Sequence, residues 1–202
     1  MIAIVDYGMG NRRSVERALE HVGAQPVLTA DHDVLREADG IVVPGVGAFP
    51  EAMRRFRAAG LDELIVERAE AGVPVLGLCL GMQLLFEASD EHEGATGLGL
   101  LPGRVRALNA PRVPHIGWNL VTFERRSALV AGLGEAAAFY HVHSLAPEPA
   151  DEHDVVGRGE YGERFVSIVE RDNVMGVQFH PEKSSRDGLQ LLRNFARVGV
   201  TA

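Results

Sequence analysis

The sequence has little cysteine, little lysine and no long hydrophobic run. Its 202 residues include one cysteine, Cys79, so this chain can form neither an internal disulfide nor a cysteine-rich metal cluster. No apolar run approaches the roughly 18 to 20 residues that a membrane-spanning helix needs. The first residues also lack the basic segment that opens a signal peptide. We therefore expect a cytoplasmic protein that has no membrane partner.

Basic residues are scarcer than acidic ones. The chain has 28 acidic and 20 basic residues, which give a formal net charge of -8, and Lys183 is its single lysine. This charge repels a phosphate backbone, so no nucleic-acid partner is expected. The hydrophobic fraction of 46% is typical of a globular protein and excludes a disordered or fibrous chain. The length predicts one domain over residues 1–202.

In the first half of the chain, short apolar segments alternate with amphipathic ones. Strands are expected at residues 2–6, 26–29, 40–43 and 73–78, helices at residues 12–22 and 80–88, and one or two helices at residues 50–71. In the first of these helices, Val15, Ala18, Leu19 and Val22 have the spacing of one apolar face. Strands that alternate with helices predict crossover units and a parallel sheet with helices on both faces.

The second half consists of short apolar segments separated by Gly, Pro, Asn or Asp. Strands are expected at residues 104–108, 120–123, 138–143, 155–159, 165–170 and 174–179. This pattern predicts antiparallel strands added to the sheet, followed by a helix with Ser184 or Ser185 as its N-cap. The predicted fold class is therefore α/β, a mainly parallel sheet with helices on both faces and added antiparallel strands in the second half.

The cysteine lies where a predicted strand runs directly into a predicted helix. Gly77 and Gly81 lie two residues to either side of Cys79, as in a nucleophile elbow with Cys in place of Ser. A helix N-terminus there favours the thiolate. The alternative is a buried structural cysteine, but this context predicts a nucleophile. An oxyanion would then need donors, and the candidates are the N–H of Leu80 and the loop at residues 44–47.

Two histidine motifs compete as partners of this cysteine. His180 ends a predicted apolar strand, and Glu182 is expected on the same side of an extended segment, as the carboxylate that orients a catalytic imidazole. His141 and His143 also share one strand face, so a metal site is the alternative for that pair. No thiolate pair or adjacent carboxylate supports such a site, and we expect neither a metal nor another cofactor.

The segments at residues 77–83 and 178–182 together resemble those of the triad (class I) glutamine amidotransferases. Further blocks at residues 5–11, 44–49, 114–119 and 180–184 are similar to the glutaminase subunits of imidazole glycerol phosphate synthases. Each block alone has modest specificity, whereas all of them in this order are highly specific. The resemblance covers nearly the whole chain.

The resemblance implies that glutamine is hydrolysed to glutamate through a thioester on Cys79, with His180 as base and acid and Glu182 as its orienting group. The ammonia passes to a cyclase subunit, which makes imidazole glycerol phosphate and aminoimidazole carboxamide ribotide in histidine biosynthesis. The oxyanion donors implied by the resemblance are Gly45, Val46 and Leu80. The implied glutamine-binding residues are Gly47, Gln83, Glu91, Ser144 and Leu145. The implied interface residues are Asn11 and Lys183.

The sequence departs from the family pattern next to this site. The usual Tyr-Phe-Val-His is here Tyr140-His141-Val142-His143, and Leu145 stands where an aromatic residue is common. These changes are expected to alter either the wall of the glutamine pocket or the loop that faces the partner, without touching the triad. Two other functions remain as alternatives: a glutaminase subunit of another pathway, such as pyridoxal phosphate or anthranilate synthesis, and a non-catalytic α/β binding module. Release of glutamate with and without the cyclase subunit would separate these alternatives.

Overall fold

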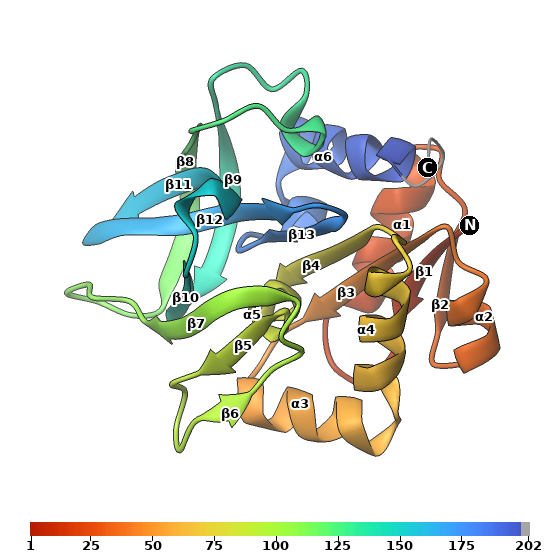
Figure 1. Cartoon of the computed structure of the whole chain (residues 1–202). Helices are drawn as coiled ribbons and strands as arrows, with labels where there is room; N and C mark the ends of the chain where they lie inside the picture. The colour runs from red at the N-terminus through yellow and green to blue at the C-terminus, as the bar shows by residue number, and fades with distance from the viewer. Residues whose placement is uncertain (199–202) are drawn as a thin grey trace.

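The computed structural model describes residues 1–198, so residues 199–202 of the predicted domain lie outside it (Figure 1). Its larger sheet has nine strands in the order β2-β1-β3-β4-β13-β12-β11-β8-β9. Five neighbouring strands are parallel: β2 (Pro26–Thr29), β1 (Ile2–Val5), β3 (Gly40–Gly45), β4 (Val75–Cys79) and β13 (Val174–Val177). The remaining strands of this sheet run antiparallel: β12 (Glu163–Arg171), β11 (Val155–Tyr161), β8 (His115–Phe123) and β9 (Ala136–His143).

A second sheet has four strands in the order β10-β7-β5-β6. These strands are β10 (Leu145–Pro149), β7 (Leu101–Ala107), β5 (Phe86–Ser89) and β6 (Ala95–Thr96). The chain passes from the larger sheet to the smaller one between β9 and β10, with Ser144 as the single residue between them. This residue therefore lies at the junction of the two sheets.

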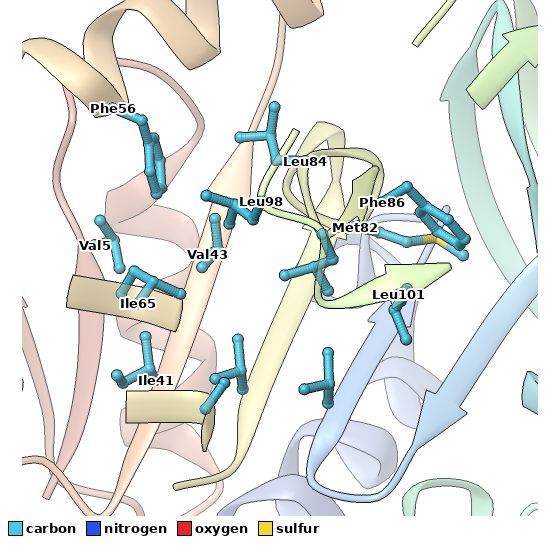
Figure 2. Packing of buried hydrophobic residues seen from close by; sticks show 14 of the residues in the cluster. Val5, Ile41, Val43, Phe56, Ile65, Met82, Leu84, Phe86, Leu98 and Leu101 are labelled. Carbon is cyan, nitrogen blue, oxygen red and sulfur yellow. The ribbon is translucent and has the colours of Figure 1, made fainter. Parts of the chain in front are cut away.

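Helices cover both faces of the parallel strands (Figure 1). The helices α1 (Arg12–His21) and α6 (Ser185–Val198) lie on one face, and α3 (Phe49–Ala58) and α4 (Leu61–Glu70) lie on the other. Successive side chains of a strand point to opposite faces, so Ile4 packs towards α1 and α6 while Val5 packs towards α3 and α4. Figure 2 shows the second of these cores, to which Val43, Ile65 and Leu98 belong.

Two short helices and three 3-10 turns make up the other helical segments of residues 1–198. The helix α2 (His32–Arg36) begins after Asp31, whose carboxylate accepts hydrogen bonds from the N–H groups of Asp33 and Val34. The turns are η1 (Ala128–Val130), η2 (Glu152–Asp154) and η3 (Pro181–Lys183). No helix within residues 1–198 is long and apolar enough to cross a membrane.

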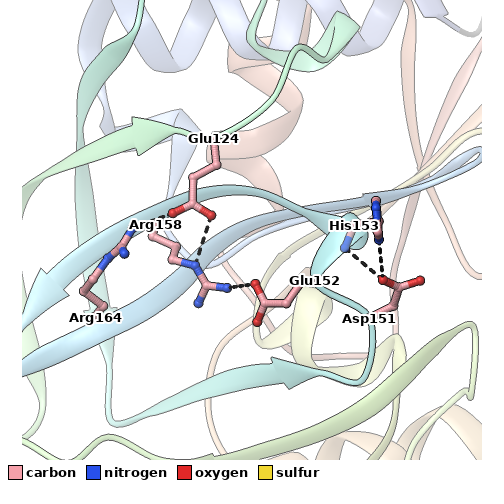
Figure 3. A network of polar contacts seen from close by, with 6 residues as sticks. All are labelled: Glu124, Asp151, Glu152, His153, Arg158 and Arg164. Carbon is pink, nitrogen blue, oxygen red and sulfur yellow. Dashed lines mark hydrogen bonds and ion pairs between the residues drawn. The ribbon is translucent and has the colours of Figure 1, made fainter.

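The antiparallel end of the large sheet carries a network of ion pairs (Figure 3). Arg158 on β11 lies 3.1 Å from a carboxylate oxygen of Glu124 and also pairs with Glu152 of η2, while Arg164 on β12 contacts Glu124. Ion pairs at a surface stabilise a fold by about 0–1 kcal/mol each. This network therefore links the antiparallel strands without dominating their stability.

The predicted α/β class, with a mostly parallel core and added antiparallel strands, is confirmed. Three of its details were wrong. The expected helix at residues 80–88 ends early, as α5 (Leu80–Leu84), and residues 86–89 form strand β5. Leu84, Leu85 and Phe86 suit either structure by their polarity, but pairing of Phe86 with Leu101 makes the segment a strand. Tertiary contacts here override local helix propensity.

The strand expected at residues 104–108 belongs to the second sheet, where β7 pairs with β5 and β10. The strand expected at residues 174–179 is not one of the antiparallel additions, because β13 runs parallel to β4. Gly176 lies opposite Gly77 there, and a Cβ at Gly176 would lie only 2.5 Å from the Cγ of Met82. Ser184, one of the two N-cap candidates, directly precedes α6, and its carbonyl accepts the N–H of Gly188 while its hydroxyl donates to the carbonyl of His180.

Candidate active site

A pocket of about 290 Å³ opens where strands β3, β4 and β13 end. The carboxyl ends of parallel strands meet at one edge of a sheet, which is where α/β proteins bind ligands. The pocket is lined by Val46, Gly47, Cys79, Leu80, Gln83, Glu91, Pro114, Val142, His143, Ser144, Leu145, His180 and Lys183. This list includes every site residue predicted from the sequence except Gly45, Glu182 and Asn11.

Cys79 is held at the sharp turn between β4 and α5. Its backbone has a φ of 54°, which is rare for a residue with a side chain, and the residue is 6% exposed. A Cβ at Gly81 would lie 1.8 Å from the carbonyl oxygen of Val43, and one at Gly77 would lie 2.6 Å from that of Gly81. The two glycines therefore permit close packing around the turn, while the left-handed backbone lies at Cys79 itself.

The sulfur of Cys79 lies near a hydrogen-bond acceptor and a hydrogen-bond donor, in addition to His180. Its thiol lies 3.6 Å from the carbonyl oxygen of Val142, and Nε2 of Gln178 lies 3.7 Å from the sulfur. Oε1 of Gln178 in turn accepts a hydrogen bond of 3.0 Å from Nε2 of Gln83. Reasoning from the sequence missed Gln178 as a site residue. The available signal was a polar side chain inside the apolar strand at residues 174–179.

His180 and Glu182 form a buried pair next to this sulfur. Nδ1 of His180 lies 3.0 Å from Oε1 of Glu182, which leaves Nε2 for the contact between His180 and Cys79. Burial lowers the pKa of His180, but hydrogen bonds to Cys79 and Glu182 outweigh it and raise the pKa to about 9. The pair is close as predicted, but for a different reason, because Glu182 lies in the 3-10 turn η3 and not in an extended segment.

The backbone of strand β9 holds His180 in place. The N–H of His180 donates to the carbonyl of Tyr140 over 2.9 Å. The N–H of Tyr140 donates to the hydroxyl of Ser184, and that hydroxyl donates to the carbonyl of His180. The backbone of His180 is therefore anchored both to strand β9, which is distant in sequence, and to Ser184, which follows it closely.

The predicted oxyanion segment lies against Cys79. Gly45 pairs with Cys79 across β3 and β4, and a Cβ at Gly45 would lie 2.7 Å from the hydroxyl oxygen of Tyr7. Val46 and Leu80 both line the pocket, and Gly47 has a φ of 104°. Tyr7 donates a hydrogen bond of 2.7 Å to the carbonyl of Pro44, and its burial raises the pKa of the phenol. A side chain at position 45 is therefore excluded by the packing.

Glu91 and the Ser144–Leu145 segment also line the pocket. Oε2 of Glu91 accepts a hydrogen bond of 2.6 Å from the N–H of Phe49, at the start of α3. The carbonyl of Ser144 accepts the N–H of Leu108 over 2.9 Å. The pocket therefore has a carboxylate, backbone groups and the Gln83 amide around Cys79, and these groups suit a ligand with an ammonium and an amide.

The two predicted interface residues lie in different positions. Lys183 is exposed at the mouth of the pocket. Asn11 does not line the pocket. It precedes α1, where its carbonyl accepts the N–H groups of Ser14 and Val15. Asn11 directly precedes α1 and Lys183 ends η3. These two elements pack against each other.

The alternative of a metal at His141 and His143 has no support in the contacts of the described residues. Nδ1 of His141 lies 3.0 Å from the carbonyl of Phe139, and its Nε2 lies 2.9 Å from the hydroxyl of Ser167. The ring nitrogens of His143 contact the carbonyl of Leu145 and the ring of His115. Within residues 1–198, no group of three or more His, Cys, Asp or Glu side chains is placed to hold a metal ion.

Both the sequence and the fold of this chain are similar to those of known proteins. The glutamine amidotransferase class-I family matches residues 3–198, and the chain belongs to that family. Solved structures agree on the fold. A crystal structure of a glutamine amidotransferase has a TM-score of 0.78 at 21% identity and covers 100% of both chains. The structure of PurLQS from Thermotoga maritima has a TM-score of 0.78 at 21% identity, covering 98% of this chain and 97% of that one.

Curated relatives of about 50% identity include subunits of one kind of enzyme. The chain is 48% identical to the imidazole glycerol phosphate synthase subunit HisH of Bacillus cereus (strain G9842), over 98% of this chain and 95% of the relative. The identity to the same subunit of Moorella thermoacetica is 50%, over 98% and 94% of the two chains. The identity to the HisH subunit of Aquifex aeolicus is 50%, over 96% of this chain and 95% of the relative. The resemblance inferred from the sequence motifs is confirmed.

Proposed function

We propose that the protein is the glutaminase subunit of an imidazole glycerol phosphate synthase. It hydrolyses glutamine to glutamate and passes the ammonia to a cyclase subunit, which makes imidazole glycerol phosphate and aminoimidazole carboxamide ribotide in histidine biosynthesis. The observation that carries this proposal is the presence of Cys79 and His180 in one pocket, with Glu182 bonded to His180, in a chain about 50% identical to such subunits. Its cytoplasmic location stays a prediction.

The first half of the reaction forms a thioester. The sulfur of Cys79 attacks the side-chain amide carbon of glutamine, while His180 holds the thiol proton. The C–N bond then breaks, and His180 gives that proton to the departing nitrogen, so ammonia leaves. Glu182 keeps Nδ1 of His180 protonated and directs Nε2 towards the reacting atoms.

The second half hydrolyses the thioester. His180 takes a proton from water, the hydroxide attacks the thioester carbon, and the C–S bond breaks to release glutamate. Both tetrahedral intermediates carry an oxyanion, for which the N–H groups of Leu80 and of the Gly45–Val46 peptide are the donors. Gln83, Glu91 and the segment Ser144–Leu145 bind the rest of the glutamine. No metal or other cofactor enters either step.

The surface beside the pocket supports a partner subunit. Ile116, Trp118 and Leu120 project from one face of β8 and are 55–61% exposed. We call these three residues the β8 stripe. Trp118 also lines a hollow with Ser184, which directly follows Lys183 at the mouth of the pocket. A contiguous exposed apolar stripe is typical of an interaction site. Docking of the cyclase subunit here would place its ammonia entrance next to the exit from the pocket.

The experiment that tests this function measures glutamate release by the chain alone and with the cyclase subunit. A glutamine-analogue electrophile is expected to label Cys79 stoichiometrically, and glutamine is expected to protect it. The variant Cys79→Ser should lose at least about a thousandfold in turnover, because a hydroxyl is far less ionised than a thiol. Ammonia-dependent synthesis by the complex should survive.

Two further variants complete this test. His180→Ala should lower glutaminase turnover nearly as much as loss of Cys79 does, because residues that act as a unit have non-additive effects. Glu182→Gln should lower turnover less, since His180 remains as the base. Retention of glutaminase activity in Cys79→Ala would overturn the mechanism. Glutamate release that does not respond to the cyclase subunit would favour a glutaminase of another pathway, and no release at all would favour a binding module.

A further inference from the structure

A second group of histidines lies beside the proposed catalytic pair and takes no part in the reaction as derived. His115 on β8 and His143 on β9 are buried, and Nδ1 of His115 lies 3.0 Å from Nε2 of His143. The ring of His115 also stacks on Tyr161, with 4.1 Å between ring centroids. Of these residues, His143 lines the pocket. Two buried imidazoles in direct contact need a defined arrangement of their protons.

The outer contacts of the pair determine where those protons are. Nδ1 of His143 lies 2.8 Å from the carbonyl oxygen of Leu145, which only accepts, so this nitrogen carries a proton. At the other end, Nδ2 of Asn119 donates to the carbonyl of Glu160 over 2.9 Å and faces Nε2 of His115 at 3.3 Å. The amide therefore presents a donor, and Nε2 of His115 accepts.

One arrangement satisfies all of these contacts. Asn119 donates to His115, His115 donates through Nδ1 to His143, and His143 donates through Nδ1 to the carbonyl of Leu145. Both imidazoles are then neutral and protonated at Nδ1. A proton added to either ring would place two donors face to face at one of the contacts. We call Asn119, His115, His143 and the Leu145 carbonyl the histidine relay.

The relay ends in the wall of the glutamine pocket. Leu145 is the first residue of β10, directly after Ser144 at the junction of the two sheets, and both residues line the pocket. The same carbonyl also accepts a contact of 3.4 Å from Nε2 of Gln83. The bond from His143 therefore acts on the peptide that shapes this wall and on a residue proposed to bind glutamine.

We propose that His115 and His143 are positioning residues that hold the Ser144–Leu145 wall in the shape that binds glutamine. The inference deepens the proposed function and rests on it. Burial lowers the pKa of His115, and burial together with the neighbouring His115 and His180 lowers the pKa of His143 to about 4. Both shifts favour the neutral rings that the relay requires. Loss of the relay should weaken glutamine binding while leaving the groups that break the amide bond in place.

The first test compares kinetic constants of variants in the complex with the cyclase subunit. His115→Phe keeps the stacking on Tyr161 and removes both relay contacts, so KM for glutamine should rise about tenfold, with kcat changed less than threefold. His143→Asn retains a donor near the position of Nδ1 and should keep KM closer to wild type than His143→Phe does. The matched control is His141→Phe, a buried histidine on the same strand that does not contact Leu145. It should leave KM unchanged.

The second test needs no activity and uses the wild-type protein. In nitrogen-15 NMR spectra of histidine-labelled protein at neutral pH, His115 and His143 should both be neutral and protonated at Nδ1. The less common tautomer at two adjacent rings identifies the relay. An Nε2-protonated or cationic ring at either position would overturn it, as would a wild-type KM in His115→Phe. A wild-type complex that does not hydrolyse glutamine would instead overturn the proposed function, while the NMR result still decides the proton arrangement of the relay.

Discussion

The sulfur of Cys79 has an environment that serves both of its ionisation states. The carbonyl of Val142 accepts from a thiol, whereas the amide of Gln178 donates to a thiolate. The amide of Gln178 is itself oriented by Gln83, because its oxygen accepts from Nε2 of that residue. A pocket residue proposed to bind glutamine is therefore connected to the nucleophile through one intervening side chain.

Replacement of Gln178 tests this connection through the reactivity of the thiol. Gln178→Leu has a similar volume and removes the donor, so alkylation of Cys79 by iodoacetamide at neutral pH should slow by about tenfold. The profile of alkylation rate against pH should move to higher pH. Gln190→Leu on α6 is the control, because Gln190 contacts Asn194 and Arg193 and not the pocket. An unchanged profile in Gln178→Leu would remove this residue from the site.

For whole elements, local sequence patterns predict where a strand lies but not which sheet it joins. Residues 26–29 and 40–43 were expected as strands, and they lie in β2 and β3, because short apolar segments bounded by turn residues are typical of strands. The sheet that a strand joins is not a local property. The segment at residues 86–89 became β5 because Phe86 pairs with Leu101, a partner that no pattern within the segment specifies.

Buried histidines on the paired strands β8 and β9 make stability depend on pH. Burial lowers the pKa of His141 well below its usual value and that of His143 to about 4, so the unfolded chain binds protons at a higher pH than the folded chain does. The stability that these two neutral histidines contribute is therefore fully present above about pH 6.5 and is lost as the pH falls towards 4. Each such histidine steepens the decline by up to about 1.4 kcal/mol per pH unit.

Urea unfolding at pH 7 and pH 5 measures this effect. His141→Phe should lose less of its free energy of unfolding between the two pH values than the wild type does, because Phe takes up no proton in the unfolded chain. His153→Gln is the control, since His153 is exposed on η2 and should leave the decline unchanged. An equal decline in His141→Phe and the wild type would contradict the assignment of this acid sensitivity to β9.

Across the whole molecule, the parallel strands place residues from distant parts of the chain at one edge. Cys79 and His180 were predictable as partners because each follows a predicted strand, and Glu182 was predictable from its place beside His180. Gln178 and the histidine relay were not, since their roles depend on which side chains meet across β8, β9 and β13. The β8 stripe was also missed, because alternate apolar residues in an antiparallel strand predict a buried face.

The position of Lys183 predicts how the molecule couples its reaction to a partner. It is exposed at the mouth of the pocket, between His180 and the hollow beside Trp118. A compact ammonium on a flexible stem suits a single ion pair across the docked surface. Lys183→Ala should therefore let ammonia escape, raising the ratio of glutamate to imidazole glycerol phosphate made by the complex by about twofold or more. Arg36→Ala, an exposed change on α2, should leave that ratio near its wild-type value. If Lys183→Ala keeps both the wild-type ratio and the wild-type affinity for the cyclase subunit, Lys183 is a solvated surface residue without a role in coupling.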